Sequence, residues 1–209
     1  MQFGSRGWQH RNWLGSFYPE DLPPEWRLPY YSNEFETVLI PSSELRASHP
    51  DQIQEWLEDC SDNFSFFIEI DAKQEFSMQL QKAQLLIPQL GGIVLDIPVK
   101  ETGYTSENIG QLVHNTLGHR VQVYAPESTS HEKIERLGAK LFKHFLTTPK
   151  PAGACLALLS DNKPSMTALK ELLAVLQATG GGCEALFLAG SNPEVEVLRQ
   201  ASDIYNLSY

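Results

Sequence analysis

The sequence has few cysteines, no long hydrophobic run and no cluster of basic residues. Its 209 residues include only three cysteines, Cys60, Cys155 and Cys183. They lie far apart and lack the spacing of metal ligands, so we expect buried or half-buried free thiols rather than disulfides. No stretch approaches the length of a bilayer-spanning helix, and no charged segment followed by an apolar one opens the chain. We therefore expect a cytoplasmic protein that does not enter a membrane.

Positive charge is also scarce. The chain carries 16 basic against 26 acidic residues, a formal net charge of −10, without a run of Lys or Arg. Such a chain repels a phosphate backbone, so nucleic-acid binding is disfavoured. The six histidines show no paired metal spacing and are missing from the predicted strand ends, which disfavours a zinc barrel. Phosphate-binding loops, dinucleotide fingerprints and nucleophile elbows are absent, so the sequence predicts neither a metal nor a cofactor.

The sequence does have a regular alternation of strand-like and helix-like segments. Short apolar runs predict seven strands, at 2–6, 37–40, 64–70, 92–97, 120–124, 154–159 and 185–188. Amphipathic patterns lie between them, and the clearest stripe consists of Leu169, Leu172, Leu173 and Leu176. Alternation of this kind predicts a parallel sheet wrapped by helices.

The helical patterns also make local predictions. Pro29 lies inside a pattern at 24–34, so this helix should begin late, with Pro29 in its first turn. Ser48 and Asp51 resemble a capping box for the next helix, and 42–43 is predicted as a polar turn. A helix is expected after the fifth strand, from the spacing of Ile134, Leu137, Leu141 and Phe145.

Seven predicted strands, with no candidate for an eighth, indicate a shortened barrel. A complete eight-unit barrel typically takes about 250 residues, which is more than this chain has. We predict an α/β fold, namely a TIM-type parallel β/α barrel with about seven strands and a gap or an open side. No linker or repeat divides the chain, so we expect a single domain over 1–209.

The first forty residues carry three of the four tryptophans and a family resemblance. Their motifs begin with Gly4, Gly7 and Trp8, and continue with Trp13, Gly15, Phe17, Tyr18, Pro19, Trp26, Tyr30, Tyr31, Phe35, Thr37 and Val38. These residues resemble the opening of the YecE-like proteins, the domain-of-unknown-function family 72. In that family the motifs read roughly G-x-S-G-W, W-x-G-x-F-Y-P, W-L-x-Y-Y and F-x-T-V-E-I-N. The resemblance implies a barrel fold and leaves the biochemistry open.

Charged residues lie near the C-terminal ends of several predicted strands. Both faces of a barrel strand are dry, so a charge there is costly unless it points into the barrel near its open end. Barrels of this kind carry their sites at that end. We therefore select a candidate pocket or internal ion cluster of Arg6, Glu69, Asp71, Asp96 and Tyr124. Within it, Arg6 is predicted to lie within salt-bridge reach of Glu69 or Asp96.

The resemblance implies that much of the polar set of the family is changed here. The aligned positions hold Arg6, Leu39, Pro41, Glu69, Asp96, Tyr124 and Pro126. One explanation is an internal salt-bridge cluster that plugs a site no longer used. The other is a pocket of changed specificity, in which Arg6 binds an anion and Glu69 or Asp96 acts as acid or base.

The aromatic loop after the first strand provides a predicted rim, formed by Trp8, His10, Trp13 and Tyr18. Most aromatic side chains of this loop are expected to be core, although some could remain exposed as a binding patch. His10 is expected to be a surface histidine of ordinary pKa.

Two functions remain open at this point. The first is a non-catalytic protein that acts through a protein-binding surface, with a second copy or a different subunit as partner and the tail at 205–209 as contact. The alternative is a metal-independent enzyme that acts on a small anionic or sugar-like substrate at the C-terminal ends of the strands.

Overall fold

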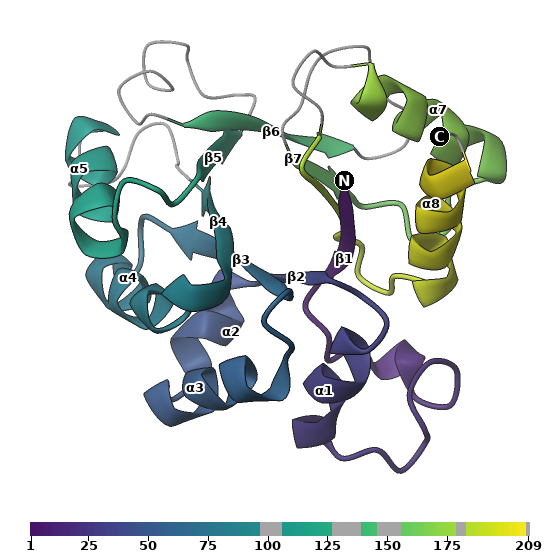
Figure 1. The fold of residues 1–209 in the computed structure, drawn as a ribbon, viewed down its shortest axis with the longest axis horizontal. Coiled ribbons are helices and arrows are strands. Elements are labelled where there is room, and N and C mark those ends of the chain that lie inside the picture. The colour runs from purple at the N-terminus through teal and green to yellow at the C-terminus, as the bar shows by residue number, and fades with distance from the viewer. Residues whose placement is uncertain (97–105, 127–138, 146–155, 179–182, 208–209) are drawn as a thin grey trace. The chain divides into compact units, whose positions relative to one another are not determined.

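A computed structural model describes residues 1–96, 106–126, 139–145, 156–178 and 183–207 of the protein (Figure 1). The strands are β1 Gln2–Arg6, β2 Thr37–Ile40, β3 Ser65–Asp71, β4 Leu90–Asp96, β5 Val123–Pro126, β6 Lys140–Phe145, β7 Leu156–Leu159 and β8 Ala185–Leu188. The helices are α1 Arg27–Ser32, α2 Ser42–Ala47, α3 Pro50–Asp59, α4 Phe76–Leu85, α5 Ser106–Leu117, α7 Met166–Gln177 and α8 Val195–Leu207.

The strands follow one another in chain order, as in a TIM-type parallel β/α barrel. The predicted fold class is therefore confirmed. The chain divides into two compact units, the first made of Met1–Val38 with Lys143–Tyr209 and the second of Leu39–Phe142. The single domain over 1–209 stays a prediction, and each unit is described by itself.

In the first unit, β7, β8 and β1 form parallel pairs. Phe3 lies beside Leu186, and Ser5 lies beside Leu188. The ring of Phe3 meets that of Tyr205 edge-on at 5.7 Å. Because Tyr205 belongs to α8, this contact places Phe3 and Ser5 on the face of β1 that α8 covers. Gly4 and Arg6 therefore face the other way, and a Cβ on Gly4 would overlap the carbonyl oxygen of Thr37.

The second unit holds the parallel strands β3, β4 and β5 and the first half of β6, up to Phe142. Ile68 and Ile70 of β3 are fully buried. Glu69 and Asp71 alternate with them and are only partly buried. By the two-residue period of a strand, these two acidic side chains share the opposite face of β3. This face carries the candidate site.

Strand β6 lies where the sequence predicted a helix, and that local prediction is wrong. The predicted stripe spaced Leu137, Leu141 and Phe145 four residues apart. A spacing of four keeps residues on one side of a helix and equally on one face of a strand, so this pattern cannot separate the two. With β6 the described residues hold eight strands, one more than the seven predicted, and the predicted residues 134 and 137 lie outside them.

Two further corrections concern the region after β2. The predicted polar turn at 42–43 begins helix α2. The cap of α3 is His49 rather than Ser48, because the His49 ring nitrogen Nδ1 accepts from the backbone N–H of Asp51. Ser48 donates instead to the Glu44 carbonyl at 2.8 Å and ends α2. Helix α1 does begin late, with Pro29 in its first turn, as predicted.

The thiol prediction is confirmed for two of the three cysteines. Cys60 and Cys183 are buried thiols, whereas Cys155 lies outside the described residues. Among the described helices, none has the length and hydropathy needed to cross a membrane.

Candidate functional site

Polar side chains form a row across neighbouring strands of the second unit. Glu69 is in register with Val94, Val94 with Tyr124, and Tyr124 with Lys140. Residues in register on parallel strands point to the same face, so the row places a carboxylate, a phenol and an ammonium group on one surface. Tyr124 is fully buried, whereas Glu69 and Lys140 are half-buried. Lys140 could not be selected as a site residue from the sequence, because its segment was predicted as helix.

A second row lies closer to the carboxyl ends of the strands. Asp71 and Asp96 are the last residues of β3 and β4 and lie in register. Asp71 follows Glu69 by two residues and therefore shares its face. Four of the five predicted cluster residues, namely Glu69, Asp71, Asp96 and Tyr124, thus come together at neighbouring strand ends in this unit.

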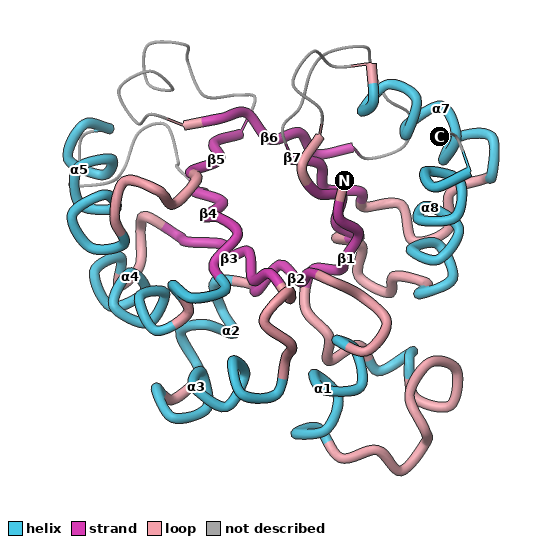
Figure 2. Tube along the Cα trace, viewed as in Figure 1, coloured by secondary structure: helices cyan, strands magenta, loops and turns pink. Residues whose placement is uncertain are grey.

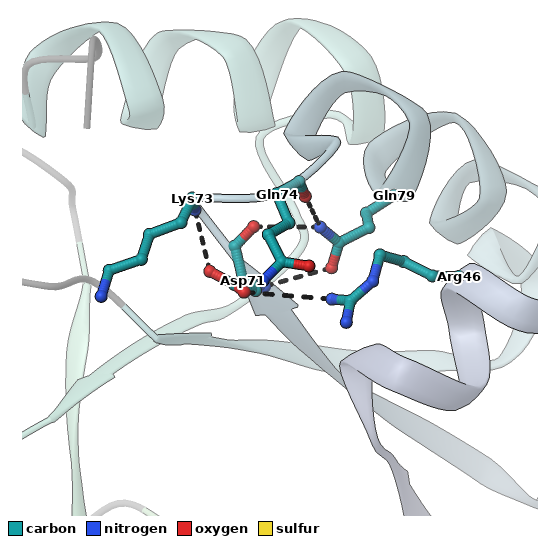
Figure 3. A network of polar contacts seen from close by, with 5 residues as sticks. All are labelled: Arg46, Asp71, Lys73, Gln74 and Gln79. Carbon is teal, nitrogen blue, oxygen red and sulfur yellow. Dashed lines mark hydrogen bonds and ion pairs between the residues drawn. The ribbon is translucent and has the colours of Figure 1, made fainter. Parts of the chain in front are cut away.

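Asp71 is held rigidly at the end of β3 (Figure 3). Its backbone N–H donates to Oε1 of Gln79 at 3.1 Å, and Nε2 of Gln79 donates back to the Asp71 carbonyl at 2.9 Å. Nε2 of Gln79 also donates to the Gln74 carbonyl, and the Gln79 side chain on α4 is fully buried. The backbone N–H of Lys73 donates to Oδ1 of Asp71 at 2.8 Å. The orientation of the carboxylate is therefore fixed by α4 and the turn after β3.

Arg46 of α2 reaches the other oxygen of this carboxylate. Its Nη1 lies 4.0 Å from Oδ2 of Asp71, and the two side chains are 21% and 18% exposed. Helix α2 is held in place by Lys82 of α4, whose Nζ donates to the carbonyls of Leu45, Arg46 and Ser48 at 3.1, 2.6 and 2.7 Å. Arg46 was also missed from the sequence, where no helix was predicted at α2.

Arg6 ends β1 in the first unit, whereas Glu69 and Asp96 belong to the second. Its predicted ion pair with one of these carboxylates therefore stays a prediction. The side chain of Arg6 is half-buried, as expected for a charge on the strand face opposite α8.

Three residues of the predicted rim are core residues of the first unit. Trp8, Trp13 and Tyr18 are each at most 2% exposed. The indole N–H of Trp13 donates to the Pro193 carbonyl at 2.7 Å, and the hydroxyl of Tyr18 donates to the Trp8 carbonyl at 2.8 Å. Figure 2 shows the long loop between β1 and α1 that these contacts hold. Their assignment to an open rim is wrong, because side chains buried in this way cannot contact a ligand.

His10 differs from its expectation as a surface histidine of ordinary pKa. Its ring lies 4.5 Å from that of Trp13, and its Nε2 is buried with no hydrogen-bond partner among the described residues. Burial lowers the pKa of His10 because it disfavours the charged imidazolium, and the positive charge of Arg6 adds to this effect. The backbone carbonyls of Gly7 and Arg6 act in the opposite direction without reversing it.

The lowered pKa of His10 predicts a dependence of stability on pH. A histidine kept neutral in the folded state stabilises the protein above its ordinary pKa, about 6.5, and this contribution is lost as pH falls below it. Urea unfolding at pH 7, 6 and 5 should therefore show a smaller loss of stability in His10→Gln than in the wild type. His119→Gln, at an exposed site, is the control and should keep the wild-type slope. Equal slopes for all three proteins would contradict the prediction.

A cavity of about 430 Å³ opens in the first unit, away from the predicted site residues. Its lining includes Phe3 at the start of β1, and Glu34 and Arg199, which form an ion pair. The amino-terminal side of barrel strands usually serves stability rather than catalysis. We therefore assign this cavity no part in the site.

A parallel β/α barrel with charged and phenolic residues gathered at the carboxyl ends of its strands defines the general class of this protein. Within that class, residues 2–186 match the sequence profile of the family described as "Protein of unknown function DUF72". The chain belongs to this family, as the opening motifs implied. No curated protein matches it in sequence.

Solved structures of the same family resemble the whole chain. A DUF72 family protein from Thermotoga maritima has 12% identity and a TM-score of 0.65, with 97% of this chain and 98% of that chain covered. One from Enterococcus faecalis has 11% identity and a TM-score of 0.64, with 98% and 97% covered. D-psicose 3-epimerase from Clostridium cellulolyticum H10 has 11% identity and a TM-score of 0.54, with 100% and 98% covered. At such identities the likeness shows the fold alone.

Proposed function

We propose that this protein binds a small sugar-like ligand at the carboxyl ends of β3 to β6. The observation that carries the proposal is the shared face of Glu69, Tyr124 and Lys140. Asp71 lies on the same face of β3, two residues closer to the end of the strand than Glu69. Barrels of this type hold their ligands at that end. The resemblance to a D-psicose 3-epimerase structure crystallised with D-tagatose adds a fold-level analogy and nothing more.

The chemistry of this face suits a ligand with many hydroxyl groups. A carboxylate only accepts hydrogen bonds, an ammonium only donates them, and a phenol does both. A sugar hydroxyl can both donate and accept, so one ligand can bond to both charged groups, whereas the Tyr124 side chain is fully buried. If turnover accompanies binding, Glu69 is placed to transfer a proton and Lys140 to stabilise negative charge that develops on an oxygen. This chemistry is that of the metal-independent enzyme predicted as the alternative function.

A protein-binding surface is the second candidate. Leu207 is 86% and Met166 is 44% exposed, and both line a pocket of about 420 Å³ between α7 and α8. Exposed apolar side chains beside a groove are typical of contact surfaces. A barrel that lacked a strand would expose unpaired strand edges and so favour a partner, but β6 supplies the eighth strand here. We therefore rank ligand binding first.

The test of the proposal is calorimetric titration with D-fructose and D-tagatose. The wild type should bind at least one of them, and Glu69→Gln and Lys140→Met should weaken binding by about tenfold or more, as expected for the loss of a charged hydrogen bond. Glu58→Gln, on the exposed side of α3, is the matched control and should bind as the wild type does. Equal binding by Glu69→Gln and Glu58→Gln would refute the assignment of the site.

A further inference from the structure

The cavity of about 430 Å³ in the first unit has a size typical of small-molecule sites, which span about 300–1,000 Å³. The apolar part of its lining includes Phe3 and Phe35, which are 8% and 6% exposed. The polar part includes a stripe on α8, spaced as residues on one face of a helix are: Arg199, Ser202, Asp203 and Asn206. Glu36, Asp203 and Asn206 are exposed, so a ligand can enter the cavity from solvent.

The guanidinium group of Arg199 is already bonded to carboxylates. Its Nε and Nη2 donate to the two carboxylate oxygens of Glu34, the second at 3.0 Å, and its Nη1 donates to Glu196 at 3.4 Å. Each nitrogen therefore has an anionic acceptor, and two negative charges adjoin one positive charge. An anionic ligand would have to displace Glu34 before it could bind the guanidinium fork. Arg199 therefore does not make this cavity an anion site.

Two carboxylates of the lining, by contrast, lack a partner. Glu36 and Asp203 form no ion pair or hydrogen bond through their side chains with any residue that the structure describes. Met1 also lines the cavity, and its amino group donates to the hydroxyl of Tyr205 at 3.3 Å. With Glu34, three carboxylates share the lining with two positively charged groups. The cavity therefore keeps an excess of negative charge.

The excess charge and the aromatic rings together select the ligand. We propose that the cavity binds a small organic cation, namely a primary ammonium group on an apolar body, which the carboxylates of Glu36 and Asp203 attract. An ammonium group only donates hydrogen bonds and a carboxylate only accepts them. The apolar body packs against Phe3 and Phe35, and aromatic rings also attract a nearby cation. A metal ion would leave most of the volume unfilled, and no group of described His, Cys, Asp and Glu residues is arranged to hold one.

This site is additional to the one proposed for a sugar-like ligand. Its residues all belong to the first unit, whereas Glu69 and Tyr124 belong to the second. Because the amino-terminal side of barrel strands rarely carries catalysis, we assign the cavity binding without turnover. The ligand contacts α8 and the segment before β2 in the folded state alone, so its binding should also stabilise the protein.

The test is calorimetric titration of the full chain with three probes that share a phenylethyl body. 2-Phenylethylamine carries a positive charge, 2-phenylethanol carries none, and 3-phenylpropanoate carries a negative charge. The amine should bind, the alcohol should bind about fivefold more weakly or less, and the carboxylate should bind most weakly. Added sodium chloride should weaken binding of the amine, because salt screens charges that are open to solvent.

Variants of the two unpaired carboxylates locate the site. Asp203→Asn and Glu36→Gln should each weaken binding of 2-phenylethylamine by about twofold to fivefold, as expected for a partly screened ion pair, and the double variant by about tenfold. Glu171→Gln is the matched control and should bind as the wild type does, because Glu171 is exposed on α7 of the same unit and does not line the cavity. Circular-dichroism melting checks that each variant folds, and the amine should raise the melting temperature of the control more than that of the double variant.

Each contrary result has a distinct meaning. Equal or tighter binding of the alcohol or the carboxylate would overturn the assignment of a cation. Binding of the amine that the double variant leaves unchanged would lie elsewhere on the protein and would overturn the assignment of the cavity. Failure of the amine to bind at millimolar concentration would overturn the inference as a whole. The proposed function is tested separately, by D-fructose and D-tagatose, and stands or falls independently of these results.

Discussion

A Trp13→Ala variant should lose about 3–5 kcal/mol of unfolding free energy, the range for truncating a large aromatic residue in a packed core. Trp13 is 1% exposed and its ring stacks on that of Tyr31, with 6.0 Å between centroids and 6° between planes. The substitution also leaves the Pro193 carbonyl without the indole N–H that donates to it at 2.7 Å. Urea unfolding followed by far-ultraviolet circular dichroism measures the loss without depending on tryptophan fluorescence.

The matched control is Trp26→Ala. Trp26 comes from the same N-terminal region but is 61% exposed, so its removal creates no cavity and should change stability by less than about 0.5 kcal/mol. Similar losses in the two variants would show that the loop between β1 and α1 is not packed as described.

These two tryptophans show what the sequence could and could not predict. Both belong to the motifs that carry the family resemblance, and nothing in the residue pattern marks one as core and the other as exposed. Burial depends on contacts with distant segments, such as the one between Trp13 and Pro193. The strand pattern, by contrast, depends on local apolar runs, and the predicted strands at 2–6, 37–40 and 185–188 have the observed bounds.

The candidate site also contains both residues that the sequence could predict and residues that it could not. Glu69 and Asp71 could be identified because two acidic residues at the end of a buried strand are conspicuous in any sequence. Arg46 and Lys140 could not, since Arg46 lies on a short helix that was not predicted and Lys140 opens the strand that was predicted as helix. Register across β3 to β6 joins Glu69 to Lys140, and register is a long-range property that hydrophobic periodicity does not contain.

In this protein, a charged group of the candidate site can be replaced without disturbing the side chains that hold the site in place. Asp71 depends on Gln79 and Lys73 for its orientation, and Arg46 depends on α2, which Lys82 holds. Substitutions at Arg46 therefore remove its ion pair with Asp71 with little loss of buried hydrogen bonds. Substitutions at Gln79 would displace Asp71 and weaken the fold as well. Arg46 is for this reason the position at which the charge beside Asp71 can be removed with the smaller effect on the fold.

A Tyr31→Phe variant should lose about 2–6 kcal/mol of unfolding free energy, although it removes only one oxygen atom. Tyr31 is fully buried, and its hydroxyl accepts from the backbone N–H of Ser5 at 2.9 Å and donates to the Thr37 carbonyl at 2.9 Å. The hydroxyl thus connects the end of β1 to the start of β2. Loss of a partner costs about 1–3 kcal/mol for each buried group left unpaired, and here two such groups remain.

Tyr30→Phe is the control for this prediction, because Tyr30 is the preceding residue and is 39% exposed. Its hydroxyl can exchange a lost partner for water, so the variant should stay within about 0.5 kcal/mol of the wild type.

Burial also raises the pKa of Tyr31, so the folded protein keeps this phenol neutral. Its contribution is complete below the ordinary tyrosine pKa, about 10, and is lost as pH rises above that value. The stability difference between wild type and Tyr31→Phe should therefore shrink under alkaline conditions. A small difference at pH 7 would contradict the predicted loss, because it would mean that the Ser5 N–H and the Thr37 carbonyl find other partners in the variant.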